Sequence, residues 1–248
     1  MTNLRRHPLA AAAGDLVIGN RCAGCAAPGL QLCSECLAAL APRTRRCWPD
    51  PCPGVLVAPP PVTPWCAAAY AAVTRRVLIE FKENRRDGLA KPLARLLTAA
   101  LAAAMAQPPA SKGWILVPMP SRRATVRTRG YDAVMLLARI AAGQLRRDGH
   151  DVVVTRSLRH RRRVADQAGL NAQQRHDNLD GALRGVVRRW PAGRQAIAVD
   201  DVITTGATLS AAVHALREAG ADIRRAAVVA ATPRETSPGR RAADREWD

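Results

Sequence analysis

One continuous stretch, Gln195 to Ala221, constrains the fold more than any other part of the chain. It begins with an apolar run, 196–199, that has the length of a buried strand. Two carboxylates, Asp200 and Asp201, follow at once, and a turn of small residues comes next, 204–208. An apolar stripe at helical spacing then runs to a glycine, a typical helix stop. This order predicts a strand, an acidic pair, a Thr/Gly loop and a helix.

The loop and the acids suit different parts of one ligand. A turn that leads into a helix N-terminus offers backbone N–H groups and the positive end of the helix dipole to a phosphate. Asp200 and Asp201 suit sugar hydroxyls or a hydrated cation instead. A ribose with a 5-phosphate needs all of these groups. The alternative is an ordinary turn that caps a helix. Two adjacent acids at the end of the strand disfavour it, because the carboxyl ends of strands are where open α/β sheets bind ligands.

The segment VDDVITTGATL resembles the phosphoribosyl-pyrophosphate (PRPP) motif of the type I phosphoribosyltransferases. The resemblance implies that Asp200 and Asp201 are the catalytic pair that holds the ribose 2- and 3-hydroxyls. It implies that the loop holds the 5-phosphate and that Mg²⁺ accompanies PRPP. The phosphate-binding candidates are Val202, Ile203, Thr204, Thr205, Gly206, Ala207 and Thr208.

Two C-x-x-C knuckles near the N-terminus predict a metal site. Cys22 and Cys25 form the first knuckle, and Cys33 and Cys36 form the second. Two knuckles complete a tetrahedral thiolate site for Zn²⁺, which stabilises a segment too short to build its own core. We expect the zinc to be structural, because four thiolates leave no position open for water.

Three further cysteines are Cys47, Cys52 and Cys66. They could form a degenerate third knuckle, but no clear partner pair is present. We therefore interpret them as thiols without metal. Cysteines grouped in metal-type spacing favour a reducing cytoplasm over a disulfide-bonded secreted protein.

A second strand–loop–helix unit is predicted upstream of the central stretch. Trp114 to Val117 is a short apolar run, and Asp132 is a candidate N-cap for the helix that follows. The loop between them is cationic and includes Arg127 and Arg129. Such a loop suits a pyrophosphate leaving group. Two more strands are expected at 151–155 and 223–231.

The segment before this unit has a pattern that fits two kinds of element. Residues 73–81 fit a helix or a strand, and they lead to Lys82, Arg85 and Arg86. These three cations are either contacts for an anionic ligand or a solvated charge cluster. A leucine stripe from Leu89 to Leu101 predicts a helix with Asp87 as a possible N-cap. Pro92 fits this helix only if it lies in the first turns.

The order of motifs resembles the ComF family of competence-associated, phosphoribosyltransferase-like proteins. The resemblance spans residues 21–232 and comprises the cysteine knuckles, Phe81-Lys82, VPMP with a downstream RGY, a polar run near a predicted short helix, 172–176, and the PRPP motif. Glu83 departs from it, since the family usually has an aromatic residue there. The resemblance and the cationic loops give the pyrophosphate or lid candidates Lys82, Arg127, Arg129, Arg162, Gln167 and Arg175.

The net charge of +18 favours anionic partners. One hypothesis is a PRPP-binding phosphoribosyltransferase associated with DNA uptake. Two alternatives use the same fold. One is a protein that binds single-stranded DNA and interacts with DNA-uptake proteins, and the other is a PRPP sensor. The composition disfavours stacking of DNA bases on the protein, because aromatic residues make up only 3% of the chain. No membrane insertion is expected, because the longest uncharged stretch, 51–74, is rich in proline.

The expected fold is α/β: a type I phosphoribosyltransferase domain with a mainly parallel sheet flanked by helices, and a small N-terminal zinc module. The expected division is a tail at 1–20, a zinc module at 21–50, a Pro-rich linker at 51–64, the main domain at 65–232 and a disordered tail at 233–248.

Overall fold

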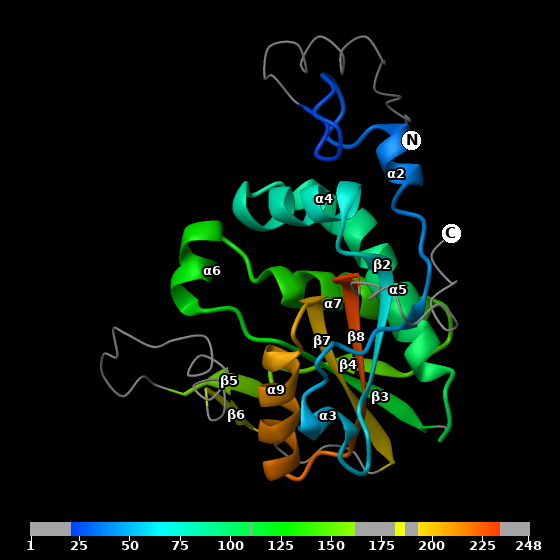
Figure 1. The fold of residues 1–248 in the computed structure, drawn as a ribbon, viewed down its shortest axis with the longest axis vertical. Coiled ribbons are helices and arrows are strands. Elements are labelled where there is room, and N and C mark those ends of the chain that lie inside the picture. Colours follow the sequence, from blue (N-terminus) through cyan, green and yellow to red (C-terminus); the bar gives the residue numbers. More distant parts are fainter. Residues whose placement is uncertain (1–20, 110, 162–181, 187–192, 234–248) are drawn as a thin grey trace, which may run out of the picture.

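The computed structural model describes residues 21–109, 111–161, 182–186 and 193–233. Its centre is a six-stranded sheet of order β1-β2-β8-β7-β3-β4, in which every neighbouring pair is parallel except β1 and β2 (Figure 1). The strands are β1 (Arg45–Arg46), β2 (Thr63–Ala69), β3 (Gly113–Pro118), β4 (Val152–Val154), β7 (Arg194–Ile203) and β8 (Ile223–Ala231). This confirms the expected mainly parallel α/β sheet.

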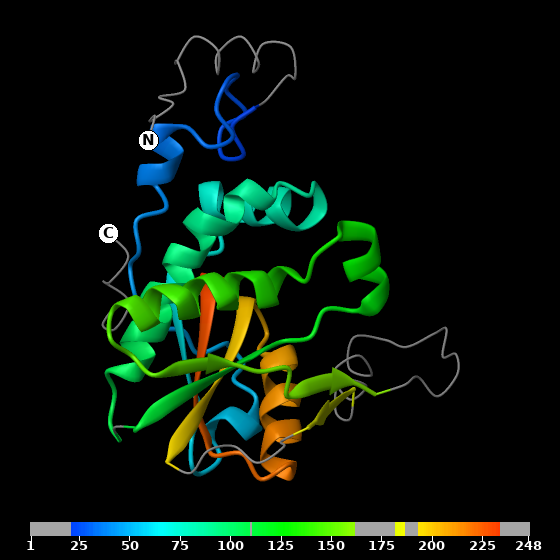
Figure 2. The ribbon, with the colours of Figure 1, turned by 180° about the vertical axis from the view of Figure 1, so that it is seen from behind.

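Helices cover both faces of the sheet (Figures 1 and 2). The helices on one face are α4 (Ala72–Glu83), α5 (Ala90–Met105) and α7 (Ala133–Arg147), and those on the other are α3 (Gly54–Val57) and α9 (Ala207–Glu218). Successive strand residues point to opposite faces. In β7, Ile197 and Val199 therefore join the core under α5 and α7, whereas Ala196 and Ala198 join the core under α9. Alanine, leucine and valine fill both cores.

Most of the predicted elements are present. Residues 73–81 are helical, within α4, and the short apolar run after Lys112 forms β3. Asp132 caps α7, because its carboxylate accepts a hydrogen bond from the Met135 N–H. Pro92 lies in the first turn of α5, where it removes no helical hydrogen bond.

Two local predictions were wrong. Asp87 does not cap α5, because a short 3₁₀ helix, η1 (Asp87–Leu89), precedes it and Leu89 occupies the cap position. The strand β7 is also longer than the run 196–199 and includes both acids. It extends because its neighbour β8 continues beside it, with Asp200 opposite Val228 and Ile203 opposite Ala231.

The Pro-rich segment is packed against the main domain. Leu56 and Val62 are fully buried in the core beneath α9. Arg217 of α9 donates hydrogen bonds to the Val55 carbonyl, at 3.1 Å, and to the Pro60 carbonyl. Upstream, β1 pairs antiparallel with β2. The division of the chain into domains remains a prediction.

Helix α5, with η1, is the one described stretch that is long and apolar enough to cross a membrane. Its apolar residues include Leu93, Leu96, Leu97 and Leu101, all fully buried against the sheet and its neighbouring helix. Packing of this kind is typical of the core helix of a globular domain.

Candidate functional site

The small-residue turn lies at the carboxyl end of β7. Gly206 adopts a left-handed conformation, with φ of 75°, and α9 begins at the next residue. The Ala207 N–H donates to the Thr205 hydroxyl at 3.4 Å, while Thr204, Thr205 and Thr208 are exposed. A small hollow of about 30 Å³ is lined by Asp200, residues 202–209 and Val228. The structure therefore brings Asp200 and every predicted phosphate-binding residue to one concave place.

The two acids point to opposite faces of the sheet, as alternation along a strand requires. Asp200 lines the hollow beside α9. Asp201 is buried, and its carboxylate lies 2.6 Å from the Lys82 ammonium of α4. Lys82 is therefore next to the acidic pair, although 118 intervening residues made this contact invisible in the sequence.

The acids differ in their electrostatic surroundings. Burial, followed by the charge of Asp201, raises the pKa of Asp200 to about 8. The Asp201 N–H, which donates to an Asp200 carboxylate oxygen at 2.9 Å, and the Lys82 ammonium oppose this rise. A carboxyl with such a pKa holds a proton near neutral pH, and a bound cation or ligand that needs its charge must displace that proton.

The helix that carries Lys82 is fixed to α7 by two aromatic residues. The Tyr131 hydroxyl donates to the Phe81 carbonyl, and the two rings lie 5.3 Å apart. The adjacent Asp132 accepts a second hydrogen bond, from the Ser121 hydroxyl at 2.9 Å. Two sequence motifs, Phe81-Lys82 and the RGY triplet, therefore meet in space.

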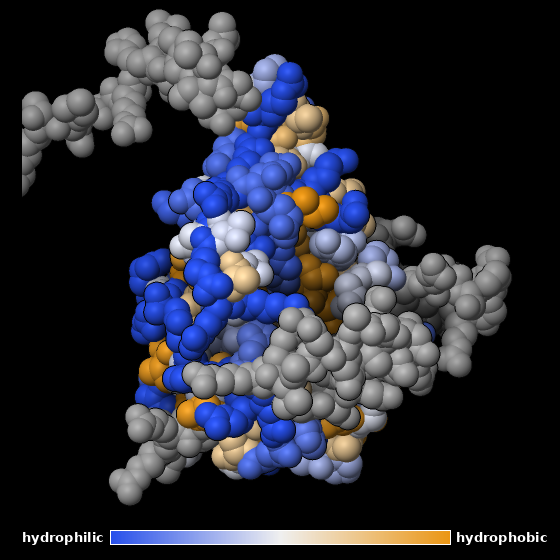
Figure 3. Space-filling view, turned by 90° about the vertical axis from the view of Figure 1, so that its left-hand side faces the viewer, coloured by the Kyte–Doolittle hydropathy of each residue, from blue (hydrophilic) through white to orange (hydrophobic). Residues whose placement is uncertain are grey.

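The structure does not bring the arginine candidates into contact with the acids. Arg127 and Arg129 belong to α6 (Arg123–Arg129), a short helix that stands away from the sheet (Figure 1). Arg129 pairs instead with Glu83 at 3.5 Å, which links α6 to α4. Glu83 thus holds the cationic helix α6 beside Lys82. On the face seen in Figure 3, hydrophilic side chains cover most of the described surface.

The remaining lid candidates, Arg162, Gln167 and Arg175, lie outside the described residues, as does the predicted helix at 172–176. The segment that contains them begins after β5 (Leu158–His160) and ends before β6 (Leu183–Gly185). These strands pair antiparallel as a separate small sheet. The His160 imidazole is hydrogen-bonded to the Pro120 carbonyl at 2.8 Å, which holds this sheet beside the end of β3.

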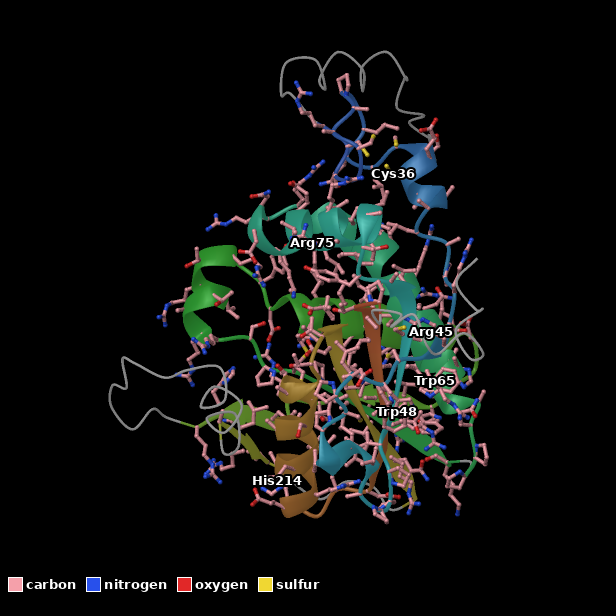
Figure 4. The ribbon with its side chains drawn as sticks, in the orientation of Figure 1. Cys36, Arg45, Trp48, Trp65, Arg75 and His214 are labelled. Atoms are coloured by element: carbon pink, nitrogen blue, oxygen red, sulfur yellow. The ribbon has the colours of Figure 1, made fainter. Side chains whose placement is uncertain are left out.

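The four knuckle cysteines converge as predicted. The sulfurs of Cys22, Cys25, Cys33 and Cys36 all lie within 4.8 Å of one another (Figure 4, where Cys36 is labelled). Burial by itself would raise the pKa of the Cys22 thiol. The backbone N–H donors of Cys33, Cys25 and Gly24 outweigh this effect and lower the pKa to about 6. Convergent thiolates with N–H···S hydrogen bonds fit a zinc ion.

The cysteine cluster is attached to the helix that carries Lys82. The Arg86 guanidinium donates to the carbonyls of Arg21 and Gln31 and pairs with Glu80 of α4 at 3.3 Å. Gly24 allows a close approach on two sides, since a Cβ there would lie 2.5 Å from the Cys36 sulfur and 3.0 Å from Val73 of α4. The sequence analysis missed this structural role of Arg86, because it depends on contacts about 55 and 65 positions away.

A second missed feature is the support behind the phosphate loop. We call residues 48–62 the strap. A Cβ added to Gly206 would lie 2.7 Å from Pro49 and 3.4 Å from Pro53, so the strap lies directly against this loop. Nothing local in the sequence connects these prolines to a loop about 150 residues later.

Comparison with known protein families places the second half of the chain in one of them. Residues 131–245 match the family described as "Phosphoribosyl transferase domain". The chain therefore contains a phosphoribosyltransferase domain, preceded by a four-cysteine cluster that can hold zinc. No curated protein matches the chain.

Proposed function

We propose that the protein binds PRPP at the carboxyl end of β7. The observation that carries this proposal is the convergence of Asp200, Asp201, Lys82 and the loop 204–208 at one edge of the sheet. The helix N-terminus and exposed threonine hydroxyls suit the 5-phosphate, while the two acids suit the ribose hydroxyls. The family match supports this assignment because such domains use PRPP.

Asp200 and Asp201, whose carboxylates suit a hydrated cation, would hold Mg²⁺, which would supply positive charge to the pyrophosphate. The chain's own contribution is to position the sugar and to stabilise charge. Asp200 and Asp201 orient the ribose, and Lys82 lies close enough to the acids to contact the pyrophosphate after ligand binding. Arg127, Arg129 and Arg162 are the further candidates for stabilising the leaving group. The chemistry would then be displacement of pyrophosphate from C1 of the ribose.

Calorimetric titration with PRPP and Mg²⁺ tests the site. The variant Asp200→Ala/Asp201→Ala should lose binding, whereas Asp222→Ala should retain it, because Asp222 lies at the other end of β8 and pairs with Arg224 on the surface. Pyrophosphate release in a screen of nucleobases would identify a transferase. Tight binding without release would identify a sensor. Absence of binding to folded, zinc-loaded wild-type protein would overturn the proposal.

The finer assignment is to the ComF family, with a role in DNA uptake and a cytoplasmic location. It is supported by the zinc-type cluster ahead of the phosphoribosyltransferase domain and by the meeting of the Phe81-Lys82 and RGY motifs. Deletion of the gene in a naturally competent host should reduce transformation, and the wild-type gene should restore it. Unchanged transformation would contradict this role.

Single-stranded DNA binding is the second candidate. It is favoured by exposed arginines on and beside α6, which include Arg122, Arg123 and Arg127. Phosphate contacts release counterions, so affinity should fall steeply with salt. Reversing the charge of Arg123 and Arg127 should reduce this salt dependence if the helix contacts DNA, and an unchanged slope would exclude that surface.

A further inference from the structure

Two buried thiols, Cys47 and Cys66, lie together at the edge of the main sheet. Cys66 is in β2, and Cys47 follows β1. Arg45 is opposite Cys66 in the antiparallel ladder, and the Cys47 N–H donates to the Pro64 carbonyl at 2.9 Å. Cys47 and Cys66 are therefore diagonal neighbours on one face. Their exposed fractions are 3% and 0%, and both belong to the core beneath α9.

The two thiols are chemically unequal. They are hydrogen-bonded to one another, and this contact lowers the pKa of Cys66 while it raises the pKa of Cys47. The Arg45 guanidinium also favours the Cys66 thiolate. Two adjacent thiols, one of which ionises more readily than the other, suit the roles of an attacking and a resolving cysteine.

The pair stands at the two ends of the strap. Residues 48–62 lie between Cys47 and Cys66, and within them Pro49 and Pro53 contact the Gly206 position of the phosphate loop. Trp48 and Trp65, which follow and precede the two cysteines in sequence, are labelled in Figure 4. A bond between the cysteines would close the strap into a loop. Closure of a loop restricts the unfolded chain and so stabilises the folded one.

We propose that Cys47 and Cys66 form a reversible disulfide when the protein is exposed to a peroxide, and that this bond fixes the strap against the phosphate loop. Cys66 loses its proton and its thiolate attacks a peroxide oxygen; the O–O bond breaks, the leaving hydroxide takes up that proton as water, and Cys66 becomes a sulfenic acid. Cys47 then loses its proton and attacks the Cys66 sulfur; the S–O bond breaks, and the leaving hydroxide takes up this second proton as water. Two thiols and one hydrogen peroxide thus give one disulfide and two waters.

The burial of the pair selects a small oxidant and makes the reaction depend on local opening. The ladder of β1 is two residues long, so this edge can open without unfolding the sheet. A third metal knuckle is the rival use of these cysteines. In the part of the chain that the structure describes, however, groups of three or more metal-type side chains converge only at the four knuckle cysteines.

Peptide mapping of peroxide-treated, zinc-loaded protein tests the proposal. Trypsin releases Cys47, Cys52 and Cys66 in a single peptide, 47–75, because no lysine or arginine lies between Arg46 and Arg75. A disulfide removes two hydrogen atoms from the mass of this peptide. Chymotrypsin then cleaves after Trp65, and the two fragments should stay joined until dithiothreitol is added.

Variants identify the bonded pair. The Cys52→Ser variant should form the disulfide as the wild type does, whereas Cys47→Ser and Cys66→Ala should not form it. A bond that persists in Cys47→Ser would join Cys52 to Cys66 and overturn the assignment. Release of zinc before any oxidation of the 47–75 peptide would also overturn it, since the knuckle thiols would then be the reactive ones.

The effect on the strap has a separate measurement. Oxidised wild-type protein should melt several degrees above the reduced form and resist cleavage within residues 48–62. The Cys47→Ser variant should show no such difference after the same treatment. An oxidised, bridged protein that melts no higher than the reduced one would overturn the proposed fixing of the strap. Neither measurement depends on PRPP binding.

Discussion

The Lys82 ammonium and the Asp201 carboxylate lie 2.6 Å apart, and this ion pair joins helix α4 to the carboxyl end of β7. Asp201 is buried, whereas the Lys82 side chain is 29% exposed. The charge of one site acid is therefore balanced by lysine, while its neighbour Asp200 tends to hold a proton. Binding of PRPP at these acids, as proposed, would have to displace both the lysine and the proton.

Replacement of Lys82 by methionine should weaken both folding and ligand binding. Asp201 would be left buried without its cation, at a cost of about 1–3 kcal/mol in the free energy of unfolding. PRPP affinity should fall by about tenfold or more, since a charge-assisted contact is removed. Urea denaturation and calorimetry measure the two effects. Lys91→Met, at an exposed position of α5, is the matched control. Equal behaviour of the two variants would contradict the role of Lys82.

The raised pKa of Asp200 predicts two effects of pH. An aspartate ionises near pH 4 in an unfolded chain, whereas Asp200 ionises at about 8 in the folded one. Its contribution to stability is thus complete below about pH 4 and is lost as pH rises through about 8. Asp200→Asn, which stays neutral, should remove this part of the decline in urea denaturation profiles.

Ligand binding should shift in the opposite direction. If PRPP with Mg²⁺ requires the ionised Asp200, its binding releases a proton and strengthens as pH approaches 8. The binding enthalpy measured by calorimetry should then vary with the ionisation enthalpy of the buffer. Asp200→Asn should lose that buffer dependence. Proton uptake by the wild type would show that Asp200 is not ionised on binding.

Substitution of Gly206 by alanine should be more costly than the same change at Gly220. Both glycines have positive φ, of 75° and 82°, where alanine is strained by about 1–2 kcal/mol. A Cβ at Gly206 would also lie 2.7 Å from Pro49, whereas no atom lies within 4 Å of one at Gly220. Thermal unfolding measures the difference in stability between the two alanine variants. Adding Pro49→Ala to Gly206→Ala should reduce that difference. Equal costs at the two sites would show that the strap does not press on the loop.

Removal of zinc should release the cysteine module from α4. Metal analysis of purified protein should give one zinc per chain, and Cys33→Ser should lower that content and the melting temperature. Arg86→Ala should lower the melting temperature with zinc retained, because Arg86 joins the module to α4 without touching the sulfurs. If the protein has the same melting temperature after a chelator has removed its zinc, the proposed structural role of the metal is wrong. Cys52→Ser serves as the control for loss of a thiol.

Sequence periodicity determined the elements whose signals are local. The strand-to-helix stretch 195–221, the strand 223–231 and the Asp132 cap depend on neighbours a few residues away, and the structure has all three. The same holds for the two cysteine knuckles, because each pair of thiols is brought together by its own short turn. The end of β7 was misplaced because hydrogen bonds to β8, rather than local hydrophobicity, extend that strand through both acids.

By itself, then, the sequence determined the order of elements, the acidic pair with its phosphate-type loop, and the cysteine cluster. Tertiary structure alone decided that Lys82 reaches Asp201, that Glu83 holds Arg129, and that Pro49 lies against Gly206. It also placed Cys47 beside Cys66, across a strand pair with the whole strap between them. These contacts depend on how the helices and the sheet edge pack around one core. The residues that make them are far apart in the chain, so no local sequence pattern predicts that they meet.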